Sequence, residues 1–393
     1  MIKTGKETIM NGTDMERYWL WLCSCPKMYR NTIMALIDYF GSPKAVYEAD
    51  TRQLLAWKRL SNEDMTAWVN ELTVYKDTTG TADAENLLMK RDLRFVSRES
   101  EGFPEKLRYL IDCPFGLFYR GSLPDPRIPA VSVVGARRCS HYGEQTAALI
   151  GKALTQEGYQ VISGMACGID GTAQSACVKE GGSSFAVLGC GADNCYPPEN
   201  KSLYSQLPQS GGILSELPPG TPPLRAHFPQ RNRLISGLSD AVIVVEARKQ
   251  SGSLITADMA LDQGKEVYAV PGRFNDLLSY GCNRLIDQGA GIVLSADSLL
   301  ENLADALNLQ RIIPAEDELT SSPETAHSRI WNRLGEEEKK VYMALGQDAM
   351  SVDEISKACG LTLLQTMNAL LGLQLKHCAE EISKNRYSLK LAS

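Results

Sequence analysis

The chain has too few basic residues to attract a polyanion by its overall charge. Its 393 residues include 41 lysines and arginines against 47 aspartates and glutamates, which gives a formal net charge of −6. Binding of nucleic acid through bulk charge is therefore excluded, and any site for a phosphate backbone must be a local cluster of cations. Hydrophobic residues make up 44% of the chain and charged residues 22%, values typical of a soluble globular protein of two or three domains.

Metal-ligand patterns and long hydrophobic runs are missing as well. The 11 cysteines are scattered from Cys23 to Cys378 without metal-ligand spacing. Cys23 with Cys25, and Cys190 with Cys195, are therefore better explained as small buried hydrophobic residues than as ligands. The sequence shows no apolar leader and no hydrophobic run of membrane length. We expect a cytoplasmic protein with reduced thiols, no metal, no cofactor and no membrane attachment.

Composition divides the chain into five segments. The polar segment 1–14 is expected to be a disordered tail, and residues 15–80 carry the short apolar-periodic stretches of a compact helical domain. Residues 81–306 form the main domain. The segment 307–330 is acidic and polar, which predicts a linker, and residues 331–393 form a small C-terminal domain.

Apolar runs of strand length alternate with helix-length segments in the main domain. A strand-like stretch at Leu93–Val96 and an extended stretch at Phe103–Gly121 precede them. This alternation predicts an α/β fold with a doubly wound, mostly parallel sheet and right-handed crossovers. Such sheets bind ligands beyond the carboxyl ends of their strands, where the winding reverses. The seven runs are Ala130–Val134, Gln160–Ile162, Ser184–Leu188, Gly212–Leu214, Ala241–Val245, Glu266–Val270 and Ile292–Leu294.

Groups that bind anions stand at the predicted strand ends. Arg137 follows the first strand, and two further arginines flank an asparagine in Phe228–Arg233, which the proline-rich stretch Leu217–Pro223 is expected to hold on a stiff loop. Planar guanidinium groups suit phosphate and stacking, and free backbone amides at helix starts also bind anions. The sequence therefore predicts a phosphate-binding rim of Gly135, Arg137, Ser163, Gly164, Gly168, Phe228, Arg231, Asn232, Arg233, Ser251 and Gly252.

Other interpretations of single residues stay open. Tight packing of helix on strand is an alternative role for the glycines, and packing is favoured for Tyr196, which could otherwise stack on a base. A dinucleotide fingerprint needs three glycines at fixed spacing, of which only Gly135 is in place, so NAD binding is not expected. Glu246 could act as a general base, but we favour a bidentate pair with a neighbouring arginine.

Several segments carry a family resemblance. They are Val133–Arg137, Ser163–Ala166 with Gly168–Asp170, Val187–Gly189, Tyr196–Pro197, Leu214–Glu216, Phe228–Arg233, Val245–Ala247, Ser251–Ala257 and Ala269–Gly272. In their order and residue identity they resemble the DNA-processing protein family DprA, also called Smf, through most of Phe103–Leu300. The resemblance implies a Rossmann-like domain that binds single-stranded DNA, forms a homodimer and loads the RecA recombinase during natural transformation and DNA recombination.

The resemblance also assigns single positions. It implies that DNA-binding residues fall on Arg137, the Ser163–Gly164 turn, the Gly168 loop and Phe228–Arg233. We expect Asp170 and Glu246 to be structural anchors, and the N-terminal helical domain to be SAM-like. Two positions depart from the family pattern, since Cys167 stands where a lysine or arginine is common and Gln174 where a histidine is usual. The departure at Cys167 predicts weakened but not lost binding.

The C-terminal domain resembles the winged-helix domain found in many family members. Its helical stretches are Glu336–Leu345, Val352–Cys359 and Leu361–Leu373, and Ala379–Ile382 with Tyr387–Leu391 forms a hairpin. A helix that reads duplex DNA normally brings arginine or lysine to the groove. The third helical stretch has neither, so a protein contact is expected for this domain.

Two functions of different classes are compatible with the sequence. In the first, a non-enzymatic mediator holds single-stranded DNA, with the arginines of the rim on phosphates and Phe228 or Tyr196 on bases. In the second, a nucleotide-processing enzyme similar to phosphoribohydrolases uses Glu246 or Asp170 as acid or base. The glycine-glycine phosphate turn and following glutamate of those enzymes resemble nothing in Ser251–Thr256. The mediator is therefore favoured.

Overall fold

The computed structural model describes residues 15–25, 28–57, 62–307, 334–345, 350–376, 379–383 and 386–389. The chain divides into two units, with the boundary between Leu309 and Gln310. The expected tail 1–14 and all of the expected linker except its first residue lie outside the described residues. No helix within the described ranges is both long enough and apolar enough to cross a membrane.

A nine-stranded sheet forms the centre of the first unit. The strands from β3 to β9 pair in parallel, whereas β1 pairs with β2, and β2 with β6, in antiparallel fashion. The predicted mostly parallel sheet is confirmed, and all seven expected strands form within two residues of their expected bounds. The order is β1-β2-β6-β5-β4-β3-β7-β8-β9. The bounds are β1 (Arg94–Ser97), β2 (Gly116–Gly121), β3 (Ala130–Val134), β4 (Gln160–Ser163), β5 (Ser184–Val187), β6 (Gly211–Ser215), β7 (Ala241–Val244), β8 (Glu266–Ala269) and β9 (Gly291–Ile292).

The winding of the sheet reverses between β3 and β7. The chain proceeds from β3 outward through β4 and β5 to β6, then returns to place β7 on the other side of β3 and continues to β8 and β9. Every residue of β3 and β7 is buried, which explains their unbroken apolar sequences. The loops that follow β3 and β7 therefore meet where a doubly wound sheet holds its ligand.

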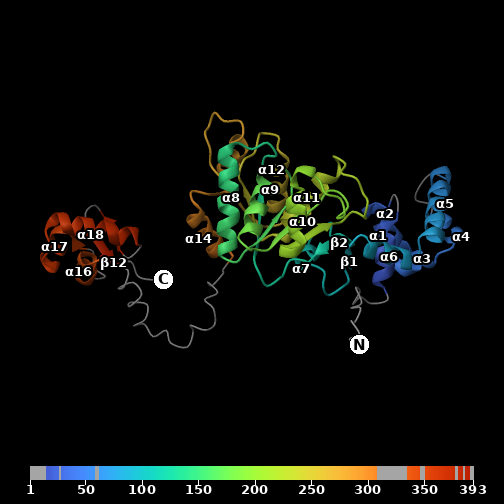
Figure 1. Cartoon of the computed structure of the whole chain (residues 1–393), viewed down its shortest axis with the longest axis horizontal. Helices are drawn as coiled ribbons and strands as arrows, with labels where there is room; N and C mark the ends of the chain where they lie inside the picture. Colours follow the sequence, from blue (N-terminus) through green and yellow to red (C-terminus); the bar gives the residue numbers. More distant parts are fainter. Residues whose placement is uncertain are drawn as a thin grey trace. The chain divides into compact units, whose positions relative to one another are not determined.

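Helices cover both faces of this sheet (Figure 1). Buried side chains of α8, α9, α10 and α14 pack on one face, and those of α7, α11, α12 and α13 pack on the other. A short 3-10 helix, η1 (Pro198–Asn200), precedes α10. The helices are α7 (Glu105–Arg108), α8 (His141–Gln156), α9 (Ile169–Lys179), α10 (Lys201–Ser210), α11 (His227–Leu238), α12 (Gly252–Asp262), α13 (Tyr280–Asp287) and α14 (Ala296–Ala306).

The segment Phe228–Arg233 belongs to helix α11 and not to a stiff loop. The expectation of a loop is wrong because Pro229 stands in the first turn of this helix, where proline is tolerated. Successive residues of an α-helix are rotated by about 100°. Arg231 and Arg233 therefore point to nearly opposite sides of α11, although the sequence places them two positions apart.

Within the described residues, six helices precede the sheet and share a core with its antiparallel edge. Trp19 stacks on Phe115 with ring centroids 5.4 Å apart, and both belong to one buried cluster with Phe95 and Phe118 of the sheet. The helical region ends at Lys90, ten residues after the expected boundary at residue 80. The helices are α1 (Glu16–Ser24), α2 (Arg30–Phe40), α3 (Pro43–Glu48), α4 (Thr51–Ala56), α5 (Asn62–Thr78) and α6 (Thr81–Lys90).

The second unit contains the three helices and the hairpin that the sequence predicts. The described elements are α16 (Glu336–Ala344), β10 (Met350–Ser351), α17 (Val352–Cys359), α18 (Leu363–Leu375), β11 (Ala379–Ser383) and β12 (Arg386–Leu389). The strands form a small sheet in the order β10-β12-β11. A core that includes Val341, Ile355 and Leu373 joins the helices.

Glu246 fixes the start of helix α8. It follows β7, is 3% exposed, and accepts hydrogen bonds from both the amide and the hydroxyl of Ser140. Ser140 caps α8 by accepting from the amide of Gly143, and a Cβ at position 143 would come within 2.5 Å of the Glu246 carboxylate. The expected arginine partner of Glu246 is therefore wrong. Its partner is a helix cap, where a carboxylate also interacts favourably with the helix dipole.

We expect Glu246→Ala to destabilise the first unit. The amide and hydroxyl of Ser140 would lose their acceptor in a partly buried place, which costs about 1 to 3 kcal/mol in the free energy of unfolding. Urea unfolding followed by circular dichroism measures this loss. The matched control is Glu144→Ala, because Glu144 is an exposed glutamate in the first turn of the same helix. Equal stability losses in the two variants would contradict the capping role.

Candidate functional site

Two adjoining cavities lie beyond the carboxyl ends of β3 and β7. The first, of about 330 Å³, is lined by Gly135 and Arg137 after β3, by Phe228 and Asn232 of α11, and by the start of α12. The second, of about 410 Å³, is lined by residues that include Cys167, Gly189 and Tyr196. Arg137, Ala166, Phe228 and Arg231 line both cavities, which together are called the crevice below.

Aromatic rings and a cation meet at the centre of the crevice. The guanidinium of Arg137 lies 4.9 Å from the centroid of the Phe228 ring, and the ring of Tyr196 lies 5.6 Å from the same ring. Arg137 is exposed. A planar cation against an aromatic face offers both a charge for a phosphate and a surface on which a base can stack.

The carboxylate of Asp170 accepts hydrogen bonds from backbone amides that the sequence analysis predicted to bind an external anion. Asp170 is 7% exposed and accepts from the amide of Gly135 at 3.4 Å and from that of Gly164 at 3.1 Å. Burial raises the pKa of this carboxyl, and the nearby charge of Arg231 opposes the shift. Contrary to expectation, these two amides are not free for an external phosphate. Asp170 thus binds two backbone amides of the protein itself, and its role as a structural anchor stays a prediction.

Arg231 binds backbone carbonyl groups at the strand ends that form the floor of the crevice. Its Nη1 donates to the carbonyl oxygen of Gly164 at 3.0 Å and to that of Val187, and its Nε donates to Asn232 Oδ1 at 3.1 Å. Burial lowers the pKa of this guanidinium to about 10. A Cβ at position 164 would come within 2.7 Å of the guanidinium, so only glycine allows this approach.

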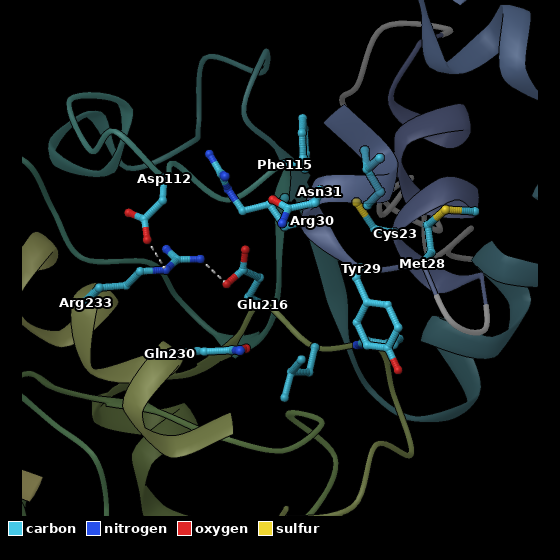
Figure 2. Close-up of a pocket in the computed structure, with 14 residues that line it drawn as sticks. Cys23, Met28, Tyr29, Arg30, Asn31, Asp112, Phe115, Glu216, Gln230 and Arg233 are labelled. Carbon is cyan, nitrogen blue, oxygen red and sulfur yellow. Dashed lines mark hydrogen bonds and ion pairs between the residues drawn. The ribbon is translucent and has the colours of Figure 1, made fainter. Parts of the chain in front are cut away.

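Arg233 lies outside the crevice. Its guanidinium forms ion pairs with Asp112, at 2.9 Å, and with Glu216, and it lines a separate cavity (Figure 2), which Arg231 does not line. Burial raises the pKa of Glu216, whereas the charge of Arg233 lowers it. The expectation that Arg233 shares a rim with Arg137 is therefore wrong, for the helical reason given above.

Ser163 and Gly168 shape the backbone around the crevice. Ser163 is fully buried, and its hydroxyl donates to the carbonyl oxygen of Val133 at 2.7 Å. Gly168 has a φ of +76°, and a Cβ there would come within 2.3 Å of the carbonyl oxygen of Ala136. The structure thus gives both residues a structural role, which sequence reasoning had kept open for the glycines.

Exposed cations follow both strands between which the winding reverses. Arg137 and Arg138 follow β3, Arg248 and Lys249 follow β7, and all four are exposed. None of the four forms an ion pair with another residue in the part of the chain that the structure describes. The start of α12 has no side-chain cap, and Gly252 faces open space. Its first amides can therefore bind an anion.

Arg138, Arg248 and Lys249 are the cations that sequence reasoning left out of the rim. Their position in the sequence could have identified them, because each follows closely on one of the two strands between which the winding reverses. Lys249 also lines a third cavity, of about 410 Å³, together with Ser251, Gly252 and Arg284. The start of α12 thus contributes to two cavities.

The two positions that depart from the family pattern have different surroundings. Cys167 is partly exposed and lines the second cavity with Arg137 and Glu199. Gln174 is fully buried. Its Oε1 accepts from the amide of Met165 at 3.0 Å, and its Nε2 donates to Ser184 Oγ at 3.1 Å. Gln174 therefore supports the backbone at Met165, which has a φ of +52°, and does not reach the crevice.

Comparison with known proteins agrees with this architecture. Residues 94–304 match the family model of DNA recombination-mediator protein A, and residues 314–381 match that of the DprA winged helix domain. Protein Smf of Synechocystis is 33% identical over 320 residues, which cover 76% of this chain and 80% of that protein. DNA processing protein DprA of Streptococcus pneumoniae is 43% identical over 198 residues, which cover 50% of this chain and 70% of that protein.

A solved structure extends the likeness to three dimensions. The X-ray structure of DNA processing protein A from Streptococcus pneumoniae superposes with a TM-score of 0.60 at 32% sequence identity, and the match covers 74% of this chain and 98% of that chain. Family models, relatives and this structure agree, and the chain belongs to the DNA recombination-mediator protein A family, DprA/Smf.

Proposed function

We propose that this protein binds single-stranded DNA in the crevice and acts as a non-enzymatic mediator of recombination. The observation that carries the proposal is the set of exposed cations that follow β3 and β7. Arg137 and Arg138 line the crevice, and Lys249 lines the cavity next to the uncapped start of α12. These groups suit phosphates. Phe228 and Tyr196 lie beside them and suit unstacked bases. Cavities of about 330 and 410 Å³ have room for single nucleotides and not for a duplex.

The partners belong to the same proposal. A single DNA strand that is held by its backbone beyond the carboxyl ends of the sheet keeps its other bases accessible. This suits transfer of the DNA to a recombinase such as RecA. The description of the family as recombination mediators supports this role. We further propose that the protein forms a homodimer through its sheet domain, and that the second unit contacts a protein, because α18 presents exposed Leu364, Met367 and Leu371.

A nucleotide-processing enzyme is the weaker proposal. Both carboxylates that it would use are engaged, since Glu246 holds the cap of α8 and Asp170 holds the amides of two strand ends. A general base must reach the proton that it removes. If either carboxylate left these hydrogen bonds to take up a proton, the backbone groups that it now binds near the crevice would lose their partner.

Arg137→Ala tests the phosphate site of the crevice. Removing one phosphate contact should weaken binding of a fluorescent single-stranded oligonucleotide and reduce the slope of log affinity against log salt by about 0.7. Fluorescence anisotropy at several salt concentrations measures both. The control is Arg127→Ala, since Arg127 is 86% exposed, pairs with Asp125 and precedes β3 at the opposite edge of the sheet. Equal effects of the two variants, or none, would remove the site from the crevice.

Arg233→Ala should behave differently from Arg137→Ala. Asp112 and Glu216 would lose their cation, and the Glu216 carboxylate, whose side chain is 25% exposed, would be left partly buried without a partner, which is destabilising. We therefore expect a lower melting temperature with an unchanged salt slope for single-stranded DNA. A reduced salt slope without loss of stability would show that Arg233 contacts a phosphate of the DNA.

Cys167→Arg should add a phosphate contact to the second cavity. Cys167 lines that cavity beside Arg137, and one more contact makes the salt slope for a single strand steeper by about 0.7. The gain in affinity should be largest at low salt, where screening is weakest. Cys167→Ser is the neutral control. A melting temperature several degrees lower, with no gain in binding, would show that this loop does not line the DNA path.

A chain that ends at Leu307 should keep its affinity for single-stranded DNA. The crevice lies wholly within the first unit, and α18 contains no arginine or lysine between Leu363 and Leu375. Anisotropy of the shortened and full-length chains with the same oligonucleotide measures this. If most of the affinity were lost on shortening, the second unit would be the main DNA site.

A further inference from the structure

A cavity of about 360 Å³ lies between the N-terminal helices and the sheet domain. Arg30 and Tyr29 reach it from the start of α2, and Gln230, Glu216 and Arg233 reach it from the sheet domain (Figure 2). It lies on the side of α11 that faces away from the crevice. The name Arg233 cavity is used for it below.

Two guanidinium nitrogens of the Arg233 cavity are buried without a hydrogen-bond partner. They are Arg30 Nε and Arg233 Nη1. The other nitrogens of Arg233 bind Asp112 and Glu216, and Arg30 Nη2 donates to the carbonyl oxygen of Ile111 at 3.1 Å. A buried donor without an acceptor costs about 1 to 3 kcal/mol. A ligand that brings acceptor atoms to this cavity would therefore bind favourably.

The charges of the cavity favour a neutral ligand. Its two guanidinium groups are balanced by the carboxylates of Asp112 and Glu216, so an added anion would lie beside two negative charges. Glu216 uses Oε2 for its pair with Arg233, and Oε1 accepts no hydrogen bond from the described residues. The cavity thus combines unfilled donors with a free acceptor. That combination matches a ligand whose edge carries both acceptors and N–H donors.

The walls of the cavity favour a flat ring. Tyr29 is 72% exposed and stacks on no other described aromatic residue. Leu217, Pro218 and the edge of Phe115 add apolar surface. Stacking on an aromatic side chain contributes about 1 to 3 kcal/mol per nucleobase. Tyr29 is therefore free to cover a heteroaromatic ring that enters the cavity.

We infer that the Arg233 cavity binds a single unstacked nucleobase, with guanine as the preferred base. Guanine offers O6 and N7 as acceptors for arginine donors, and its N1–H and N2–H groups can donate to Glu216 Oε1. Adenine presents an amino donor in place of O6, and thymine and cytosine are smaller. The placement of this cavity on the path of a bound strand rests on the proposed function. The expected affinity of the cavity for a free nucleoside does not rest on it.

Titration of the full-length protein with free nucleosides, followed by saturation-transfer NMR, tests the inference. A nucleoside has no phosphate, so the cations of the crevice contribute little. We expect 2′-deoxyguanosine to bind about tenfold more tightly than 2′-deoxyadenosine, and Tyr29→Ala to weaken its binding at least about fivefold. The matched control is Tyr109→Ala, because Tyr109 is 78% exposed and lies outside the Arg233 cavity.

A second variant and a second ligand keep the test decisive. Glu216→Gln removes the carboxylate acceptor and should bring the two purine nucleosides to near-equal affinity. Absence of nucleoside binding, an equal loss in Tyr109→Ala, or inorganic phosphate binding that Tyr29→Ala abolishes would overturn the inference. Arg127→Ala, at an exposed residue outside the Arg233 cavity, should leave 2′-deoxyguanosine binding unchanged, and a loss of binding in this variant would count against the cavity. If 2′-deoxyguanosine binds but oligonucleotides do not, the proposed function fails while the nucleobase site stands.

Discussion

The crevice depends on one buried pair of opposite charges, Asp170 of α9 and Arg231 of α11. Asp170 accepts from the amides that follow β3 and β4, and Arg231 donates to carbonyl oxygens at the ends of β4 and β5. Two side chains thereby satisfy polar backbone groups at the ends of three adjacent strands. Leaving such groups unpaired in a buried place would be costly, and each charge lowers the cost of burying the other.

This arrangement separates the cations that build the crevice from those that face a ligand. Arg231 is nine-tenths buried, and its Nε and Nη1 bind the protein itself, whereas Arg137 and Arg138 extend from the loop after β3 and are exposed. A largely buried guanidinium that binds backbone carbonyls holds its position and has fewer donors left for an external phosphate than an exposed one. Exposed cations over a rigid floor bind phosphates without reorganising the strand ends, and such preorganisation favours affinity.

The sequence predicts the sheet well and the details of the site less well. Strands buried on both faces give continuous apolar runs such as Ala130–Val134, so their bounds can be read within two residues. β2 was expected only as extended chain, because Pro114 and Gly116 resemble irregular structure. The partners of Asp170 could not be predicted, since Gly135 is 35 positions away and the contact exists only because β3 and β4 are neighbours. Arg231 and Arg233 were grouped because a loop was assumed where α11 forms.

A local cluster of cations explains how an acidic chain could bind the proposed polyanionic ligand. The net charge of −6 repels DNA at long range, but charges separated by more than about 10 Å are largely screened at 0.1 M salt. Near the start of α12, the proposed ligand would meet Arg137 and Lys249, which share cavities with Gly252, and the amide dipoles of the helix. The carboxylate of Asp170 binds internal amides, and the charge of Arg231 partly neutralises it. The proposed role as a mediator would also require release of the strand, and a site of few cations in an acidic protein binds less tightly than a strongly basic surface would.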